Sequence, residues 1–230
     1  SFFYPALLFL VLFSFVAVAT SNYRIRRQGR SHLIALAATF TILPAMLAVP
    51  FREAVGATSF LSAWFEMVSS ITTTGATLYA PDRLPPSAHL WRALVGWMGG
   101  FFVWVTAVAV LAPLNLGGFE VRSTAEIGQG AAPSQITRVA DMSERLVRFS
   151  RALFPIYAGL TAVLWTALII AGDAPLVAIS HAMSTLATSG ISPVGGMQSA
   201  SSGLVGEGIV LLFFMGLRRG LIIGSVLLVT

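Results

Sequence analysis

Two short runs of hydroxyl side chains, each around one glycine, are the parts of this chain whose residue types best suit the binding of an ion. The first run is SSITTTGATLY (residues 69–79) and the second is STLATSGIS (residues 184–192). A glycine tolerates a positive φ, so successive carbonyl groups can turn the same way, while short Ser and Thr side chains add hydroxyl oxygens. Because rings of backbone carbonyls replace the hydration shell of a cation in ion filters, the two runs predict cation ligands.

The two runs align with each other at one fixed offset. Gly190 lies 115 residues after Gly75. The same offset pairs one hydroxyl residue with another at five further positions: Ser69 with Ser184, Ser70 with Thr185, Thr73 with Thr188, Thr74 with Ser189, and Thr77 with Ser192. Each run lies between two apolar segments, which indicates a tandem repeat of one membrane unit. Parallel repeats of a membrane unit place a site on the axis that relates them.

The composition of the chain indicates whether these runs lie in a membrane protein or in a soluble one. Of the 230 residues, 56% are hydrophobic and 10% are charged, whereas a soluble domain has about 25% charged residues. Apolar blocks near the ~20 residues that cross a bilayer occupy residues 5–21, 33–49, 90–111, 149–171 and 204 onward. We therefore expect an all-α integral membrane protein with at least four spans and a fifth in the last block. The absence of cysteine excludes disulfides and thiolate metal sites from the chain.

The basic residues, all of them arginine, indicate the orientation in the membrane. One cluster lies at residues 24–30 after the first block, and another lies at residues 122–151 before the fourth. The positive-inside rule places both on the cytoplasmic side, so the net charge of +5 indicates topology and no nucleic-acid binding is expected. Residues 52–89 then lie outside, where the apolar stretch TSFLSAWFEMVSS is long enough for a short helix only. We expect a re-entrant pore helix and loop, since irregular backbone at membrane depth must line a cavity or be buried in protein.

The repeat divides the chain into four expected parts. Residues 1–31 form an N-terminal transmembrane segment and a cytoplasmic arginine loop, and residues 32–116 form the first pore repeat. Residues 117–148 form a cytoplasmic connection with an amphipathic helix. Residues 149–230 form a second pore repeat, which we expect to be truncated because the chain stops inside an apolar run.

Several stretches together resemble a known family. FEMVSSITTTGAT, LWRALVGWMGG, PLNLGG at residues 113–118 and AISHAMSTLATSGIS are similar to the first two pore repeats of Trk/Ktr-type (TrkH-like) potassium transporter membrane subunits. The resemblance covers residues 32–210 and implies helix–pore loop–helix repeats like fused potassium-channel subunits around one pore. It implies that the filter positions are Thr73, Thr74, Gly75, Ala76, Thr188, Ser189, Gly190 and Ile191.

The resemblance also implies a function and a setting. The expected function is potassium uptake through a backbone-carbonyl filter to which this chain supplies two of four loops. The chain would lie in the cell membrane, the inner membrane of a bacterium, surrounded by lipid. It would form a homodimer, and it would also bind a cytoplasmic nucleotide-binding regulatory subunit. Potassium is the expected transported ligand, with no cofactor and no metal site beyond the filter.

Two alternatives to this function are open. The chain is either such a subunit, a truncated membrane fragment that transports nothing, or part of a subunit for another monovalent cation such as sodium. An enzyme is not expected, because no nucleophile with a paired base, and no metal-ligand spacing, is visible in the spans.

Four further polar residues lie in apolar surroundings. Arg218 and Arg219 lie about fourteen residues into the last block, where each charge costs ~2.5–3.5 kcal/mol. They are either close to the inner boundary, part of a stretch that is not native, or a gate that lines the inner vestibule. Glu66 and His181 each lie nine residues before the glycine of a run, and hydrogen-bonded packing is the expected role of both.

Overall fold

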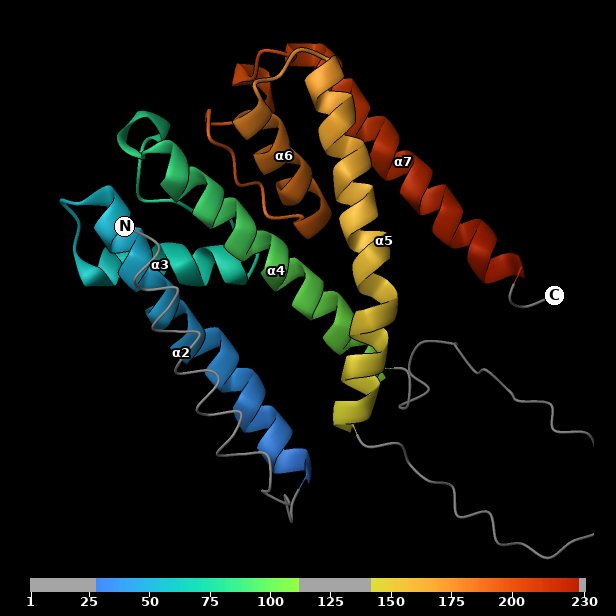
Figure 1. The fold of residues 1–230 in the computed structure, drawn as a ribbon. Helices are drawn as coiled ribbons and strands as arrows, with labels where there is room; N and C mark the ends of the chain where they lie inside the picture. The colour runs from blue at the N-terminus through green and yellow to red at the C-terminus, as the bar shows by residue number, and fades with distance from the viewer. Residues whose placement is uncertain (1–27, 112–141, 228–230) are drawn as a thin grey trace, which may run out of the picture. The chain divides into compact units, whose positions relative to one another are not determined.

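The computed structural model describes the backbone of residues 28–111 and 142–227, and the side chains of residues 40–107 and 147–216 (Figure 1). Within these ranges all regular structure is helical, which confirms the all-α expectation. The helices are α2 (Gln28–Val55), α3 (Phe60–Ile71), η1 (Pro81–Arg83), α4 (Pro86–Leu111), α5 (Met142–Ile170), α6 (Pro175–Ala187), η3 (Met197–Ser199) and α7 (Gly203–Leu227).

Four of the predicted spans correspond to helices of the structure, namely α2, α4, α5 and α7. Helices α4 and α5 are long and apolar enough to cross a membrane, over Pro86–Ala107 and Val147–Ile170. The apolar part of α2 and the short helix α3 form a pair bent by 118°, the geometry of a broken span or a re-entrant loop. The first predicted span and the arginine cluster at residues 24–27 lie outside the described residues.

The two short helices α3 and α6 begin at residue types that commonly start helices. Ser59 is the N-cap of α3, with an extended backbone and a side-chain oxygen that accepts a hydrogen bond from the backbone N–H of Ser62 (3.1 Å). Helix α6 has Pro175 at its first position, where no N–H is needed. Asp173 does not cap α6. Its Oδ1 accepts a hydrogen bond from the backbone N–H of Ser202 (2.8 Å), so it connects the start of α6 to the start of α7.

The described residues fall into two compact units. One unit comprises the residues up to Gly100 and those from Leu160, and it contains both glycine-bearing loops. Its first repeat has a buried core built around Phe51 and Met67. The other unit, residues 101–159, is held by aromatic contacts of Phe101 with Phe154 and Tyr157, at ring-centroid distances of 5.6 and 5.4 Å.

Helix α5 begins earlier than the predicted second repeat. It starts at Met142, so the last residues of the predicted cytoplasmic connection continue without a break into the span that follows. The remainder of that connection, residues 112–141, lies outside the described part of the chain. The amphipathic helix expected within residues 117–148 therefore stays a prediction for the part before Met142.

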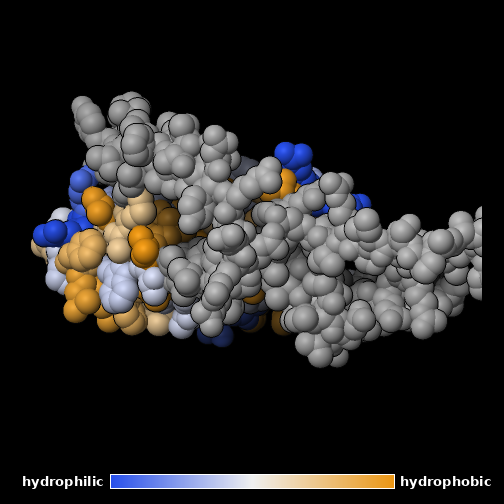
Figure 2. Space-filling view, turned by 90° about the horizontal axis from the view of Figure 1, so that it is seen from below, coloured by the Kyte–Doolittle hydropathy of each residue, from blue (hydrophilic) through white to orange (hydrophobic). Residues whose placement is uncertain are grey.

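Large apolar side chains are widely exposed on these helices. The exposed fraction is 60% or more for several residues, including Ile42, Leu61, Ile170, Leu204 and Leu212. Figure 2 shows apolar side chains gathered on the surface of the described part beside a few strongly polar ones. Extended apolar surface of this kind marks contact with a membrane or with other protein.

Candidate functional site

The loops that follow α3 and α6 have the same unusual backbone. Thr73 (φ 56°) and Gly75 (φ 71°) in the first loop are matched by Thr188 (φ 54°) and Gly190 (φ 68°) in the second. Among the described residues, Thr73 and Thr188 are the only ones other than glycine with a positive φ. A positive φ in a β-branched residue costs about 1–3 kcal/mol. Strain of this size at equivalent positions indicates that each loop is held in one shape by its surroundings.

Backbone hydrogen bonds hold the first half of each loop against its helix. Two of these bonds recur 115 residues apart. Thr73 N–H to Ser70 O (3.0 Å) matches Thr188 N–H to Thr185 O (3.1 Å), and Thr74 N–H to Ser69 O (2.9 Å) matches Ser189 N–H to Ser184 O (2.9 Å). These bonds satisfy carbonyl groups that would otherwise be left unpaired at a helix C-terminus.

The two loops lie directly against each other through glycines. A β-carbon placed on Gly75 would lie 1.8 Å from the backbone oxygen of Ser189. On α4, a β-carbon on Gly96 would lie 2.9 Å from Cδ1 of Ile191, and one on Gly99 would lie 2.0 Å from the backbone oxygen of Ile71. Distances under 3.0 Å do not occur for real β-carbons, so Gly75 and Gly99, which meet backbone atoms, require glycine for this close approach. At Gly96 the close atom is the flexible end of the Ile191 side chain, which can shift.

The eight predicted filter residues do not have equal surroundings. Thr74, Ala76, Thr188 and Gly190 are exposed, Thr73 and Gly75 are half-buried, and Ser189 and Ile191 are buried. The backbone oxygen of Ala76 accepts a hydrogen bond from the Ser69 hydroxyl (2.7 Å), so this carbonyl is directed at α3. The Ile191 side chain packs on Gly96. Arg218 and Arg219 belong to helix α7, but the structure describes only their backbone and not their side chains.

Glu66 is fully buried behind the first loop, and both of its carboxylate oxygens are engaged. Oε1 accepts hydrogen bonds from Thr77 Oγ1 (3.0 Å) and from the backbone N–H of Leu78 (2.5 Å). Oε2 lies 2.9 Å from Nε of Arg92, in an ion pair whose side chains are 0% and 4% exposed. The packing role expected for Glu66 agrees with this geometry. Arg92 was not singled out in the sequence, although a charge within an apolar block needs a buried partner.

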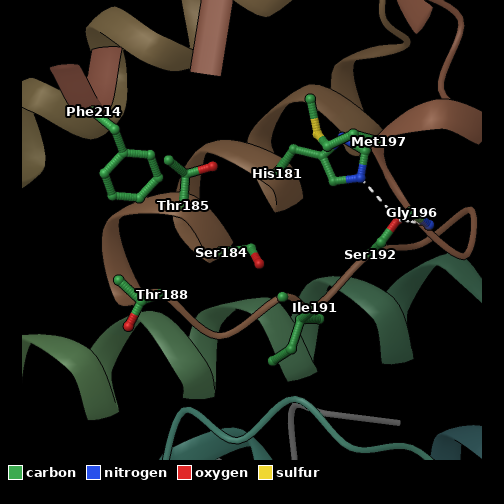
Figure 3. A pocket seen from close by; sticks show the side chains of 10 residues that line it. His181, Ser184, Thr185, Thr188, Ile191, Ser192, Gly196, Met197 and Phe214 are labelled. Atoms are coloured by element: carbon green, nitrogen blue, oxygen red, sulfur yellow. Dashed lines mark hydrogen bonds between the residues drawn. The ribbon is translucent and has the colours of Figure 1, made fainter. Parts of the chain in front are cut away.

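His181 lies at the equivalent place behind the second loop. Its Nε2 is 2.8 Å from Ser192 Oγ, and this oxygen also accepts hydrogen bonds from the backbone N–H groups of Val194 (3.2 Å) and Gly196 (2.9 Å) (Figure 3). His181 is 2% exposed, as expected for a structural histidine. Among the described residues there is no group of three or more His, Asp or Glu side chains that could hold a metal ion.

A cavity of about 380 Å³ runs beside the second loop. Its lining includes the polar residues His181, Ser184, Thr185, Thr188 and Ser192. Figure 3 shows His181 near one end of this cavity and Phe214 of α7 near the other, beside Thr185. The lining also includes the apolar side chains of Ile191, Met197 and Phe214, so the wall of the cavity is largely apolar with a few hydroxyl groups and one imidazole.

Apolar helices, a sharply bent helix pair and a repeated glycine loop together define a helical membrane protein. A family model described as "TrkH: Cation transport protein" matches residues 5–203. The chain therefore belongs to this family of cation transport proteins, which is a family of transporters and not of enzymes.

Individual relatives agree with the family match. The Trk system potassium uptake protein TrkH of Vibrio parahaemolyticus is 35% identical over 167 residues, which are 72% of this chain and 33% of that protein. The TrkH protein of Escherichia coli K12 is 32% identical over 168 residues, again 72% of this chain and 33% of the relative. The chain thus spans 33% of the length of these curated relatives.

A solved structure supports the same fold. The crystal structure of the potassium transporter TrkH from Vibrio parahaemolyticus superposes with a TM-score of 0.66 at 28% sequence identity. The match covers 89% of this chain and 40% of that one. The expected resemblance to Trk-type membrane subunits is confirmed by this match and by the family model.

Proposed function

We propose that this chain supplies two of the four filter loops of a potassium-uptake pore. The residues concerned are Thr73, Thr74, Gly75, Ala76, Thr188, Ser189, Gly190 and Ile191. The observation that carries the proposal is the paired backbone geometry, in which a left-handed Thr and a left-handed Gly recur in both loops at the same spacing. The names of the relatives, which are potassium uptake proteins, support potassium as the ion.

The proposed mechanism follows from the positions of the loops after α3 and α6. Each loop continues from a helix C-terminus, whose partial negative charge favours a cation nearby. Alternating left-handed residues turn neighbouring carbonyl groups toward a common space, where they replace water around a dehydrated ion. Because the Ala76 carbonyl is bonded to Ser69, the carbonyls of Thr73, Thr74 and Gly75 are the better candidates in the first loop.

The remaining parts of the proposal concern the setting of this pore. We propose a multi-pass protein of the cell membrane in which residues 32–116 and 149–230 are pore repeats and residues 117–148 connect them on the cytoplasmic side. Homodimer formation and a cytoplasmic nucleotide-binding regulatory subunit belong to the same proposal, and they rest on family resemblance. Arg218 and Arg219 would form a charge barrier on the inner side. If so, changing both to Gln raises the maximal uptake rate and leaves the ion preference unchanged.

The proposal is tested by changing the two loop glycines in the complete reading frame that contains this chain. Gly75→Ser and Gly190→Ser are expressed in cells that lack potassium uptake, and potassium and sodium uptake are measured. A side chain disturbs a loop that needs positive φ, so we expect weaker potassium affinity and a lower preference for potassium over sodium. Unchanged uptake in both variants would contradict the filter assignment. A wild-type protein that prefers sodium would contradict the choice of ion.

A further inference from the structure

The side chains behind the two loops differ in chemistry but make an equivalent contact. Thr77 Oγ1 lies 3.0 Å from Glu66 Oε1, and Ser192 Oγ lies 2.8 Å from His181 Nε2. Both pairs are separated by 11 residues, and each member of one pair lies 115 residues from its counterpart. We refer to these two contacts as the loop-end hydrogen bonds.

Counting donors and acceptors fixes the direction of the bond in the second repeat. A hydroxyl group has one hydrogen and two lone pairs. Ser192 Oγ already accepts hydrogen bonds from the N–H groups of Val194 and Gly196, so both lone pairs are used. Its hydrogen is then donated to Nε2 of His181. The histidine is therefore neutral, with its own hydrogen on Nδ1.

In the first repeat the hydroxyl group is also the donor. Thr77 Oγ1 accepts a hydrogen bond from the backbone N–H of Tyr79 (3.2 Å) and donates to Glu66 Oε1 (3.0 Å), with the backbone oxygen of Tyr79 as a second, longer acceptor (3.3 Å). The other carboxylate oxygen of Glu66, Oε2, forms an ion pair with the buried guanidinium of Arg92 (2.9 Å). The carboxylate of Glu66 and the neutral imidazole of His181 thus share one property. Each presents a hydrogen-bond acceptor to the loop in front of it.

The position of the two hydroxyl residues explains why such an acceptor matters. Thr77 comes two residues after Gly75, and Ser192 comes two residues after Gly190. Backbone bonds to Ser69 and Ser184 hold the start of each loop. The loop-end hydrogen bonds hold the other end. Each strained loop is therefore fixed on both sides of its glycine, and the direction of its carbonyl groups depends on both attachments.

We infer that Glu66 and His181 are positioning residues that set the preference of the pore for potassium over sodium. They act by holding the hydroxyl groups of Thr77 and Ser192, and the inference rests on the proposed function of the loops. A loop with a loosened end can close around the smaller sodium ion, whereas a loop fixed at both ends keeps the spacing that suits potassium.

The test uses variants that remove or keep a single hydroxyl group in the complete protein. Thr77→Val and Ser192→Ala remove it, while Thr77→Ser and Ser192→Thr keep it. Preference is measured as the ratio of potassium to sodium uptake in cells without other potassium uptake. Because a bond to a charged group is stronger than a neutral one, we expect the ratio to fall about tenfold for Thr77→Val and about threefold for Ser192→Ala. The variants that keep the hydroxyl should retain a ratio close to that of the wild type.

Two controls separate this result from a general loss of structure. Thr166→Val removes a hydroxyl that donates to the backbone oxygen of Ala162 within α5 (2.8 Å), far along the chain from either loop, and should leave the ratio unchanged. If Thr77→Val does not reach the membrane, the uptake ratios of Ser192→Ala and Ser192→Thr are compared instead.

The possible outcomes distinguish this inference from the proposed function. If the hydroxyl-removing variants leave the ratio unchanged while Gly75→Ser and Gly190→Ser lower it, the loops form the filter and the inference is wrong. If the glycine variants also leave it unchanged, the proposed function fails and the inference fails with it. A ratio that falls equally for Thr77→Val and Thr77→Ser would show that packing, and not the hydrogen bond, is what matters.

Discussion

The backbone of Gly75 lies directly against the carbonyl oxygen of Ser189, where a β-carbon would be 1.8 Å from that oxygen. A β-carbon on Gly190 would meet no atom within 4 Å. The two glycines have nearly the same φ, 71° and 68°, so they differ in their neighbours and not in their conformation. Gly75 is therefore required by its positive φ and by its contact with Ser189, whereas Gly190 is required by its positive φ alone.

This difference predicts that replacing Gly75 and replacing Gly190 lower the free energy of unfolding of the chain by unequal amounts. Gly190→Ala should lower the free energy of unfolding by about 1–2 kcal/mol, the cost of a left-handed conformation for a residue with a β-carbon. Gly75→Ala should cost more, because the Ser189 backbone must also move. Thermal unfolding of the two purified variants in detergent would measure the difference. Equal melting temperatures would contradict the close approach of the two loops.

A second prediction concerns the contact between α4 and the end of α3. Gly99→Ala places a β-carbon 2.0 Å from the backbone oxygen of Ile71, which is not a flexible side-chain end, and we expect a loss of about 1–3 kcal/mol. Gly159→Ala in α5 is the matched control, since no atom lies within 4 Å of its β-carbon. That change should stabilise the helix by up to about 1 kcal/mol. Melting temperatures that rise for both variants would contradict the predicted contact.

The buried ion pair gives a third prediction. Arg92→Gln leaves the Glu66 carboxylate buried without its partner, which should cost about 3–5 kcal/mol. The double variant Glu66→Gln with Arg92→Gln should cost less than the sum of the single variants, because no unpaired charge remains. Arg83→Gln, at an exposed position in η1, should change stability little. Additive losses in the double variant would mean that the two side chains do not interact.

Features that depend on neighbouring residues are the ones that the sequence predicts best. The short helix α3 lies where the sequence predicts it, and its Ser59 cap and the start of α6 at Pro175 depend on residues next to one another in the sequence. The bond between Asp173 and Ser202 joins residues 29 positions apart, so no neighbouring residue indicates it. Tertiary contacts of this kind leave no periodic pattern in the sequence.

The candidate site likewise has features that follow from spacing along the sequence and features that depend on tertiary contacts. The repeat offset revealed both glycines and the equivalence of Glu66 with His181, because these are matters of spacing. It did not reveal that Thr73 has a positive φ, since a β-branched residue adopts it only when tertiary contacts hold the loop. Arg92 became visible as the partner of Glu66 only after α4 was placed beside α3.

The last prediction concerns the orientation of the repeats in the membrane. The chain contains no cysteine, so a single introduced cysteine is its only thiol and can be labelled selectively. Ser87 and Ser201 are exposed and lie next to the starts of α4 and α7, on the side predicted to be outside. Ser87→Cys and Ser201→Cys should react with an impermeant maleimide added to intact cells. Ser31→Cys and Ser134→Cys, beside the arginine clusters, should react only after the membrane is opened. Labelling of Ser87→Cys from outside but Ser201→Cys from inside would show that the two repeats are inverted relative to each other, which parallel pore repeats do not allow.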